Sequence, residues 1–133
     1  MKRLKPLARD ERGGTITEFA FALPILATLL IGILQSSLML YAKSGMRHGI
    51  GEAARFAKVY RAADSATVLA KVRGAVYGVE PSGIKTLTFQ RTTSANGEDR
   101  ATITMSYQPN SYIPFVPRIP VTLTETRTVY LPE

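Results

Sequence analysis

The chain has 133 residues, a net charge of +7 and no cysteine. That length suits one long helix with one small domain rather than two independent domains. The missing thiols exclude disulfide bonds and cysteine-based metal sites. Only 91 residues follow residue 42, which is sparse for an enzyme with a deep active-site cleft. We therefore expect a protein that is not an enzyme and that carries neither a cofactor nor a metal.

Residues 1–13 form a short leader with five basic and two acidic side chains, which supply +3 of the total charge. The leader contains Pro6 and shows no apolar periodicity, so it predicts no stable element of its own. Basic charge beside an apolar segment usually serves membrane orientation and contact with anionic lipid, so we do not expect a nucleic-acid partner. Basic residues also follow the apolar segment, and charge alone therefore does not fix the topology.

An apolar run extends from Phe19 to Ala42, with no Lys, Arg, Asp or Glu in its 24 positions. As a helix it would be roughly 36 Å long, enough to cross a hydrocarbon core of about 30 Å. The sequence therefore predicts a single membrane span. Its large apolar side chains include Phe19, Leu23, Leu30, Leu34 and Leu40.

Two other interpretations apply to this run. A secretory signal has an apolar core of about 7–15 residues, followed by a small-residue cleavage site. Here the run is longer, and its one Ala-x-Ala motif, Ala20-Phe21-Ala22, lies at its start. An uncut signal anchor fits the length, but it explains neither the glycine pair before the run nor Glu18.

Pro24 interrupts the hydrogen-bond ladder of the span because it has no N–H to donate to the carbonyl of Ala20. We expect a kink or local unwinding there. The small side chains of Gly32, Ser36 and Ser37 would permit close approach of another helix. Proline and glycine are also common in membrane helices generally, which is an alternative reason for Pro24.

Glu18 is the one acidic residue at the entrance of the span. A carboxylate near a membrane interior is costly unless it is paired, so its presence indicates a function. If the chain is cut after Gly13, the new amino group of Gly14 lies four residues before Glu18 and can pair with the carboxylate of a neighbouring subunit. The alternative is that Glu18 reaches water at the interface and has no role.

The helix is expected to continue beyond the membrane to about residue 61. Apolar side chains recur there at three- and four-residue steps and predict an amphipathic extension. Its stripe consists of Met46, Ile50, Ala53, Ala54, Ala57 and Tyr60. Gly45 and Gly49 lie four residues apart and would allow a close contact with another element.

Residues 62–133 predict a small soluble domain. A second helix should begin with Asp64 or Ser65 as N-cap and run to about Tyr77, with Gly78 as its C-terminal cap and a break at residues 81–83. Its apolar side consists of Val68, Leu69, Val72 and Val76.

The period then changes from 3.6 to 2, which is typical of strands. Residues 101–107 alternate most clearly, residues 86–90 alternate before them, and Asn96-Gly97 between these runs indicates a hairpin turn. Further alternation at residues 121–131 follows a proline-rich loop at residues 108–117. The predicted fold class is α+β: a long helix, a short helix and an antiparallel sheet of three to four strands with its apolar face covered by one or both helices.

Three other patterns carry little functional weight. The sequence Gly49-Ile50-Gly51-Glu52-Ala53-Ala54 fits a loose dinucleotide motif, but it lies in a helical pattern without a preceding strand. His48 is the single histidine and has no second ligand at metal-binding spacing. A basic and aromatic group would suit a sugar or single-stranded nucleic acid, although packing is the commoner role of such side chains. This group comprises Arg100, Tyr107, Tyr112, Phe115, Arg118, Arg127 and Tyr130.

The segment from Arg12 to Pro24, RGGTITEFAFALP, resembles the processing region of the TadE-like minor pilins (pseudopilins) of the tight-adherence (Tad/Flp) pilus system. The stretch Ala53-Ala54-Arg55 and, more loosely, the strand-rich tail are similar to the same family. The resemblance implies that a prepilin peptidase cleaves between Gly13 and Gly14. It also implies that Glu18, at the fifth mature position, acts in recognition and assembly together with Phe19 and Pro24.

The resemblance further implies a minor pilin that initiates, primes or caps a type IV pilus used in surface adhesion. Such a protein sits in the bacterial inner membrane with its N-terminus cytoplasmic and its sheet domain periplasmic, until it enters the pilus. Its partners would be other minor and major pilins and the pilus assembly platform. Major pilins of this system are much shorter and lack a sheet, so the long tail favours a minor component.

Two alternatives stay open at this point. The sequence does not separate the TadE type from the related TadF type, and Phe19, where major pilins tend to carry tyrosine, does not decide between them. The chain can also be interpreted as a membrane-anchored binding module, an adhesin or DNA-capturing surface that is not processed as a pilin.

Overall fold

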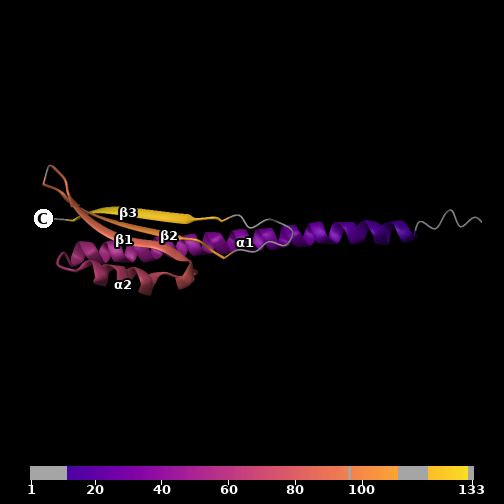
Figure 1. The fold of residues 1–133 in the computed structure, drawn as a ribbon, viewed down its shortest axis with the longest axis horizontal. Helices are drawn as coiled ribbons and strands as arrows, with labels where there is room; N and C mark the ends of the chain where they lie inside the picture. Colours follow the sequence, from indigo (N-terminus) through magenta and orange to yellow (C-terminus); the bar gives the residue numbers. More distant parts are fainter. Residues whose placement is uncertain (1–11, 96, 111–119, 132–133) are drawn as a thin grey trace, which may run out of the picture.

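The computed structural model describes residues 12–95, 97–110 and 120–131. Its elements follow one another as two helices, a short 3-10 turn and three strands (Figure 1). They are α1 (Arg12–Val59), α2 (Ser65–Ala75), η1 (Pro81–Gly83), β1 (Ile84–Thr93), β2 (Asp99–Tyr107) and β3 (Leu123–Leu131). The predicted α+β fold with a long apolar N-terminal helix is therefore confirmed, with three strands in the described part of the chain.

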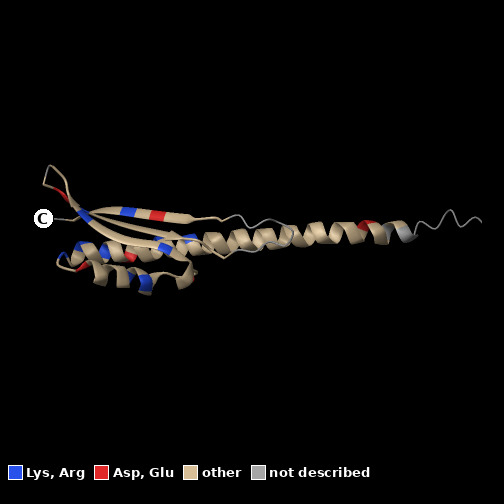
Figure 2. Ribbon diagram, viewed as in Figure 1, with Lys and Arg blue, Asp and Glu red and all other residues tan. Residues whose placement is uncertain are grey.

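The helix α1 has two halves with different surroundings. Its C-terminal half lies beside α2 and under the sheet, whereas its N-terminal half extends away from every other described element (Figure 1). The charged side chains follow the same division, because the extended half shows a single acidic position and the folded half carries bands of both signs (Figure 2). Among the described residues, α2 and the sheet therefore pack against the C-terminal half of α1.

The core forms where the apolar stripe of α1 meets the sheet and α2. Ala42 and five of the six predicted stripe residues are buried, and Met46, Ala53 and Ala57 have no exposed surface. The prediction for Tyr60 is wrong, since its side chain is 58% exposed. The reason is that α1 ends at Val59, so Tyr60 lies past the last helical residue, with its ring 4.7 Å from that of Phe56 between centroids.

Glycines allow α2 to lie directly against α1. A Cβ atom at Gly45 would overlap the carbonyl group of Tyr77, coming within 2.7 Å of its carbon atom. A Cβ atom at Gly49 would overlap Val76 and would lie 3.1 Å from the carbonyl oxygen of Val72. The close contact expected at these two glycines is therefore present, and α2 is the element that makes it.

The N-cap of α2 is Asp64, as its sequence predicts, and its carboxylate accepts a hydrogen bond from the backbone N–H of Thr67 at 3.1 Å. Hydrogen bonds from the side chain and backbone of Thr67 lower the pKa of Asp64, because they favour the ionised carboxylate. The predicted C-terminus is wrong. The helix ends at Ala75 with Val76 as C-cap, and Gly78, with φ +66°, forms the turn that follows.

The sheet has the order β1-β2-β3, and both pairs are antiparallel. The inward face of β2 consists of Ala101, Ile103, Met105 and Tyr107, all buried. The outward face is rich in threonine, and Thr102 and Thr104 exchange hydrogen bonds with Thr128 and Thr126 across the β2–β3 pair. Of the predicted hairpin turn, Asn96 lies outside the described residues, while Gly97 has the positive φ of +82° that such a turn requires.

The local unwinding expected at Pro24 is absent. The helix α1 is continuous from Arg12 to Val59 and contains this residue. Proline removes only one hydrogen bond of the ladder, and the ladder resumes on both sides. The hydroxyl of Thr28 also donates to the Pro24 carbonyl at 2.8 Å.

We predict that Gly45→Ala destabilises the folded half of the molecule by about 1–3 kcal/mol, because the new methyl group displaces the backbone at Tyr77, just after α2. Gly74→Ala is the matched control, since a Cβ atom there meets nothing within 4 Å. The control should be neutral or stabilising by up to about 1 kcal/mol, because alanine favours a helix over glycine. Thermal unfolding in detergent micelles measures both, and equal melting temperatures for the two variants would refute the close contact.

Candidate functional site

The candidate site is the extended N-terminal half of α1, which we call the bare half (residues 14–41). Most of its large apolar side chains are exposed, for example Phe21 at 73% and Ile25 at 72%. A soluble protein rarely exposes an apolar surface of this extent unless a membrane or another protein covers it. The described part of the chain contains one helix, Ile16–Val59, that is long and apolar enough to cross a membrane.

The residues predicted for the membrane span all belong to this surface. Phe19, Leu23, Leu30, Leu34 and Leu40 are between 52% and 69% exposed. Exposed apolar side chains at the intervening positions 25, 26, 29, 33 and 38 complete the circumference of the helix. A helix that is apolar on all sides is typical of a membrane span or of the centre of a helical assembly. The bare half therefore has no polar face that would suit it to lie at a water surface.

The predicted processing and assembly residues lie at the N-terminal end of the bare half. The helix α1 begins at Arg12, two residues before the start that the sequence indicated. Gly13 and Gly14 therefore lie within its first turn. Glu18 is exposed and stands about 6 Å along the helix axis from Gly14, at 1.5 Å per residue. The Glu18 carboxylate is therefore accessible near the N-terminal end of the bare half.

The hydroxyl groups of the bare half bond to their own helix. Ser36 donates to the carbonyl of Gly32 and Ser37 to that of Ile33, each at 2.9 Å. Their hydrogen-bonding capacity is thus partly satisfied before any partner arrives, which lowers the cost of placing them in an apolar environment. Pro24, Ile25, Thr28 and Leu29 line a shallow apolar hollow of this surface.

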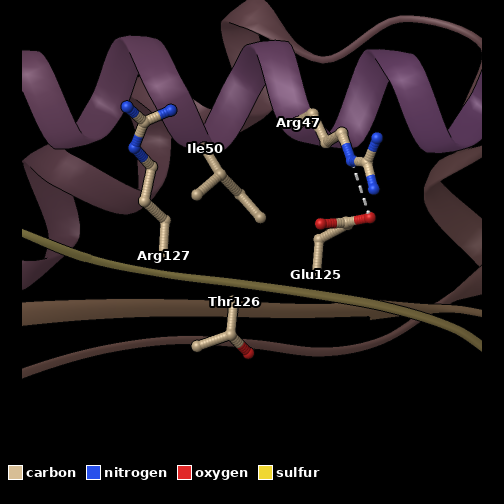
Figure 3. A pocket seen from close by; sticks show the side chains of 5 residues that line it. All are labelled: Arg47, Ile50, Glu125, Thr126 and Arg127. Atoms are coloured by element: carbon tan, nitrogen blue, oxygen red, sulfur yellow. Dashed lines mark hydrogen bonds and ion pairs between the residues drawn. The ribbon is translucent and has the colours of Figure 1, made fainter.

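The folded half of α1 is attached to β3 by an ion-pair cluster that the sequence analysis missed. The carboxylate of Glu125 accepts a hydrogen bond from Nε of Arg47 at 3.0 Å (Figure 3). It also lies 3.7 Å from Nζ of Lys43. The Glu125 side chain is only 16% exposed. The sequence did contain an indication of this cluster. In the period-two pattern, Glu125 lies on the same inward face of the strand as Leu123, so its carboxylate would need a partner inside the fold.

Arg127 lies two residues further along the same face of β3 and also points toward α1, whereas Thr126 points away from it (Figure 3). A Cβ atom at Gly51 would lie 3.3 Å from the Arg127 guanidinium, so the side chain passes close to the helix backbone. Arg47, Arg55, Lys58 and Arg127 line one groove along α1, with Glu52 as its acidic member. This groove is open to solvent and basic.

The remaining sequence candidates, His48 and the dinucleotide-like motif, lie in the folded half of α1. The described residues contain no cluster of three metal-ligating side chains, and His48 lies 5.7 Å from the ring of Tyr77. The dinucleotide-like motif is part of α1, where Gly49 receives α2.

The basic and aromatic group does not form one surface. Tyr107 is buried, while Arg100 stacks on Tyr130 at 4.9 Å. Arg127 is three residues from Tyr130 in β3 and therefore faces the opposite side of the sheet. Tyr112, Phe115 and Arg118 lie outside the described residues.

Comparison with known families identifies the segment that contains the bare half. Residues 13–55 match the family model described as TadE-like protein. The chain carries a TadE-like segment. No curated protein and no solved structure matches the chain.

The TadE-like segment covers the bare half and the first part of the folded half of α1, through Arg55. It includes Gly13, Gly14, Glu18 and Pro24, and it ends before α2 and the sheet. The match supports a pilin-like role associated with a Tad pilus. The single long apolar helix fits a single-pass membrane protein.

We predict that Arg47 and Glu125 are energetically coupled by about 1 kcal/mol in a double-mutant cycle of Arg47→Ala and Glu125→Gln. The half-buried carboxylate strengthens this pair, while the 65% exposure of Arg47 limits it. The control cycle uses Glu52→Gln and Arg55→Ala, an exposed pair within α1 that should give roughly 0.3 kcal/mol. Denaturant unfolding of the four variants of each cycle measures the coupling, and equal values for the two cycles would contradict the attachment of β3 through Glu125.

Proposed function

We propose that this protein is a minor pilin of a Tad-type pilus and that it acts as a structural subunit rather than as an enzyme. The observation that carries the proposal is the bare half of α1. In the membrane-length apolar stretch of this helix, 0% of the residues are buried by the rest of the chain. Such a segment needs an external partner. A bilayer would cover it before assembly, and the helices of other pilins would cover it in the fibre.

The processing step follows from the N-terminal end of this segment. A prepilin peptidase would remove residues 1–13 and leave Gly14 as the new N-terminus. The free amine would then lie at the membrane end of the bare half, close in sequence to Glu18. In a fibre of staggered parallel helices, Glu18 of one subunit would neutralise the amine of the next, and the cost of an unpaired charge in an apolar interior would select the register.

The topology that suits this role has the leader in the cytoplasm and the folded half, with α2 and the sheet, in the periplasm. The role in the pilus would be initiation, priming or capping, since the sheet domain sets the chain apart from short major pilins. Phe19 and Pro24 would contribute to recognition by the assembly machinery. Other minor and major pilins and the assembly platform would be the partners.

The experiment that tests the proposal compares Glu18→Gln with Glu52→Gln in the native host. Both variants neutralise one carboxylate of α1, exposed at Glu18 and partly exposed at Glu52, but only Glu18 lies at the end of the bare half. We expect Glu18→Gln to be inserted in the membrane at the wild-type level and to lose most surface pili, while Glu52→Gln keeps them. Counting pili by electron microscopy and the subunit in sheared fractions by immunoblot gives the result. Wild-type pili with Glu18→Gln would contradict the assembly role.

A further inference from the structure

The end of the folded half that faces the bare half carries an aromatic and apolar rim, in which Tyr41, Tyr77 and Pro81 are exposed and Val79 is partly buried against the core. Four residues form it: Tyr41 of α1 and Tyr77, Val79 and Pro81 of the link from α2 to β1. Tyr41 is 55% exposed and Tyr77 38% exposed, and their rings lie 5.2 Å apart between centroids. We call these four residues the interfacial rim.

Contacts with α1 fix the position of the rim along the helix axis. The phenol oxygen of Tyr77 lies 3.0 Å from the hydroxyl of Ser44, and the Tyr77 backbone rests on Gly45. A Cβ atom at Gly78 would lie 2.7 Å from the ring of Tyr41. No residue of α1 separates the bare half from the domain, because Ala42, the last residue of the apolar run, is already 98% buried by it. The folded half therefore starts where the apolar run stops.

The link from α2 to β1 lies at the end of the domain that faces the bare half (Figure 1). The backbone N–H of Glu80 lies 3.4 Å from the phenol oxygen of Tyr107, which fixes the link against the last residue of β2. An apolar groove of about 310 Å³ adjoins it, and Val76, Val79, Pro81 and Ile84 are among its lining residues. Apolar and aromatic surface thus continues from the bare half onto the domain.

Tyrosine is enriched at membrane–water interfaces, where its ring contacts the acyl chains and its hydroxyl stays with the headgroups. We propose that the interfacial rim is a lipid-binding surface that seats the soluble domain directly on the headgroup layer. This inference rests on the membrane insertion of the bare half in the proposed function. The exposed carboxylate of Glu80 within the link keeps the contact shallow, because the charge must stay in water.

Contact with the headgroup layer explains one feature of the rim that packing within the chain does not. Tyr41 and Tyr77 already contact each other, yet both keep large exposed ring surfaces. Lys43 follows Tyr41 at the level where a basic side chain can reach lipid phosphate, while it also lies 3.7 Å from Glu125. In this arrangement the domain cannot tilt freely about the end of the span, so the groups it presents to other subunits keep a fixed orientation to the membrane.

The test uses tryptophan fluorescence, because the chain contains no tryptophan. Full-length single-tryptophan variants are placed in vesicles of phosphatidylethanolamine and phosphatidylglycerol, with and without lipids brominated near the headgroup end of their acyl chains. Tyr77→Trp reports on the rim, and Phe21→Trp, measured also with lipids brominated deeper in the chain, reports on insertion of the bare half. Tyr60→Trp is the control, since Tyr60 is 58% exposed, close to the 55% of Tyr41. Tyr60 directly follows the last residue of α1, about 27 Å further from the membrane than Tyr41 at 1.5 Å per helical residue.

We expect the brominated lipids to quench most of the emission of Tyr77→Trp and almost none of that of Tyr60→Trp. Quenching of Phe21→Trp together with unquenched Tyr77→Trp would contradict lipid binding by the interfacial rim but would still support insertion of the bare half in the membrane. Unquenched Phe21→Trp would overturn insertion itself and lipid binding by the rim with it. If Tyr77→Trp does not fold, Pro81→Trp takes its place, because Pro81 is exposed in the same rim and its replacement adds bulk toward solvent.

Discussion

One physical constraint organises this molecule: α1 is a single continuous helix whose apolar side chains find internal partners only in its second half. In the first half most of the large apolar side chains are more than half exposed, whereas Met46, Ala53 and Ala57 in the second half have no exposed surface. Apolar area of this extent must leave water, because its burial is the main favourable term in folding and association. Burial of the bare half in a membrane or against other subunits is therefore strongly favourable.

The folded half is built to hold its domain on one side of that helix. Gly45 and Gly49 bring α2 into backbone contact, and Glu125 fixes β3 to Arg47 across 78 positions of sequence. At the far end of the domain, Arg61 and Asp99 lie 3.4 Å apart and join the end of α1 to the start of β2. These contacts connect α2, β2 and β3 to α1, so they fix the position of the domain along the helix.

Local patterns in the sequence predicted much of this fold. The apolar run, the Asp64 cap, the inward face of β2 and the contact at Gly45 and Gly49 each depend on spacing or on one residue's local chemistry. The Glu125 cluster was missed because pairing between distant residues needs the strand register. Tyr60 was misjudged because a periodic stripe does not show where a helix ends, and Pro24 because the continuing ladder on both sides keeps the helix intact.

The central claim is that the bare half becomes an assembly surface after the leader is removed at Gly13. The most direct test is the intact mass of the protein, purified from membranes of cells with and without the prepilin peptidase. We predict that the peptidase-containing cells yield a chain lighter by residues 1–13, and that the peptidase-free cells yield the full chain. The full mass in both preparations would contradict the claim and would leave an uncut membrane anchor that carries the sheet domain.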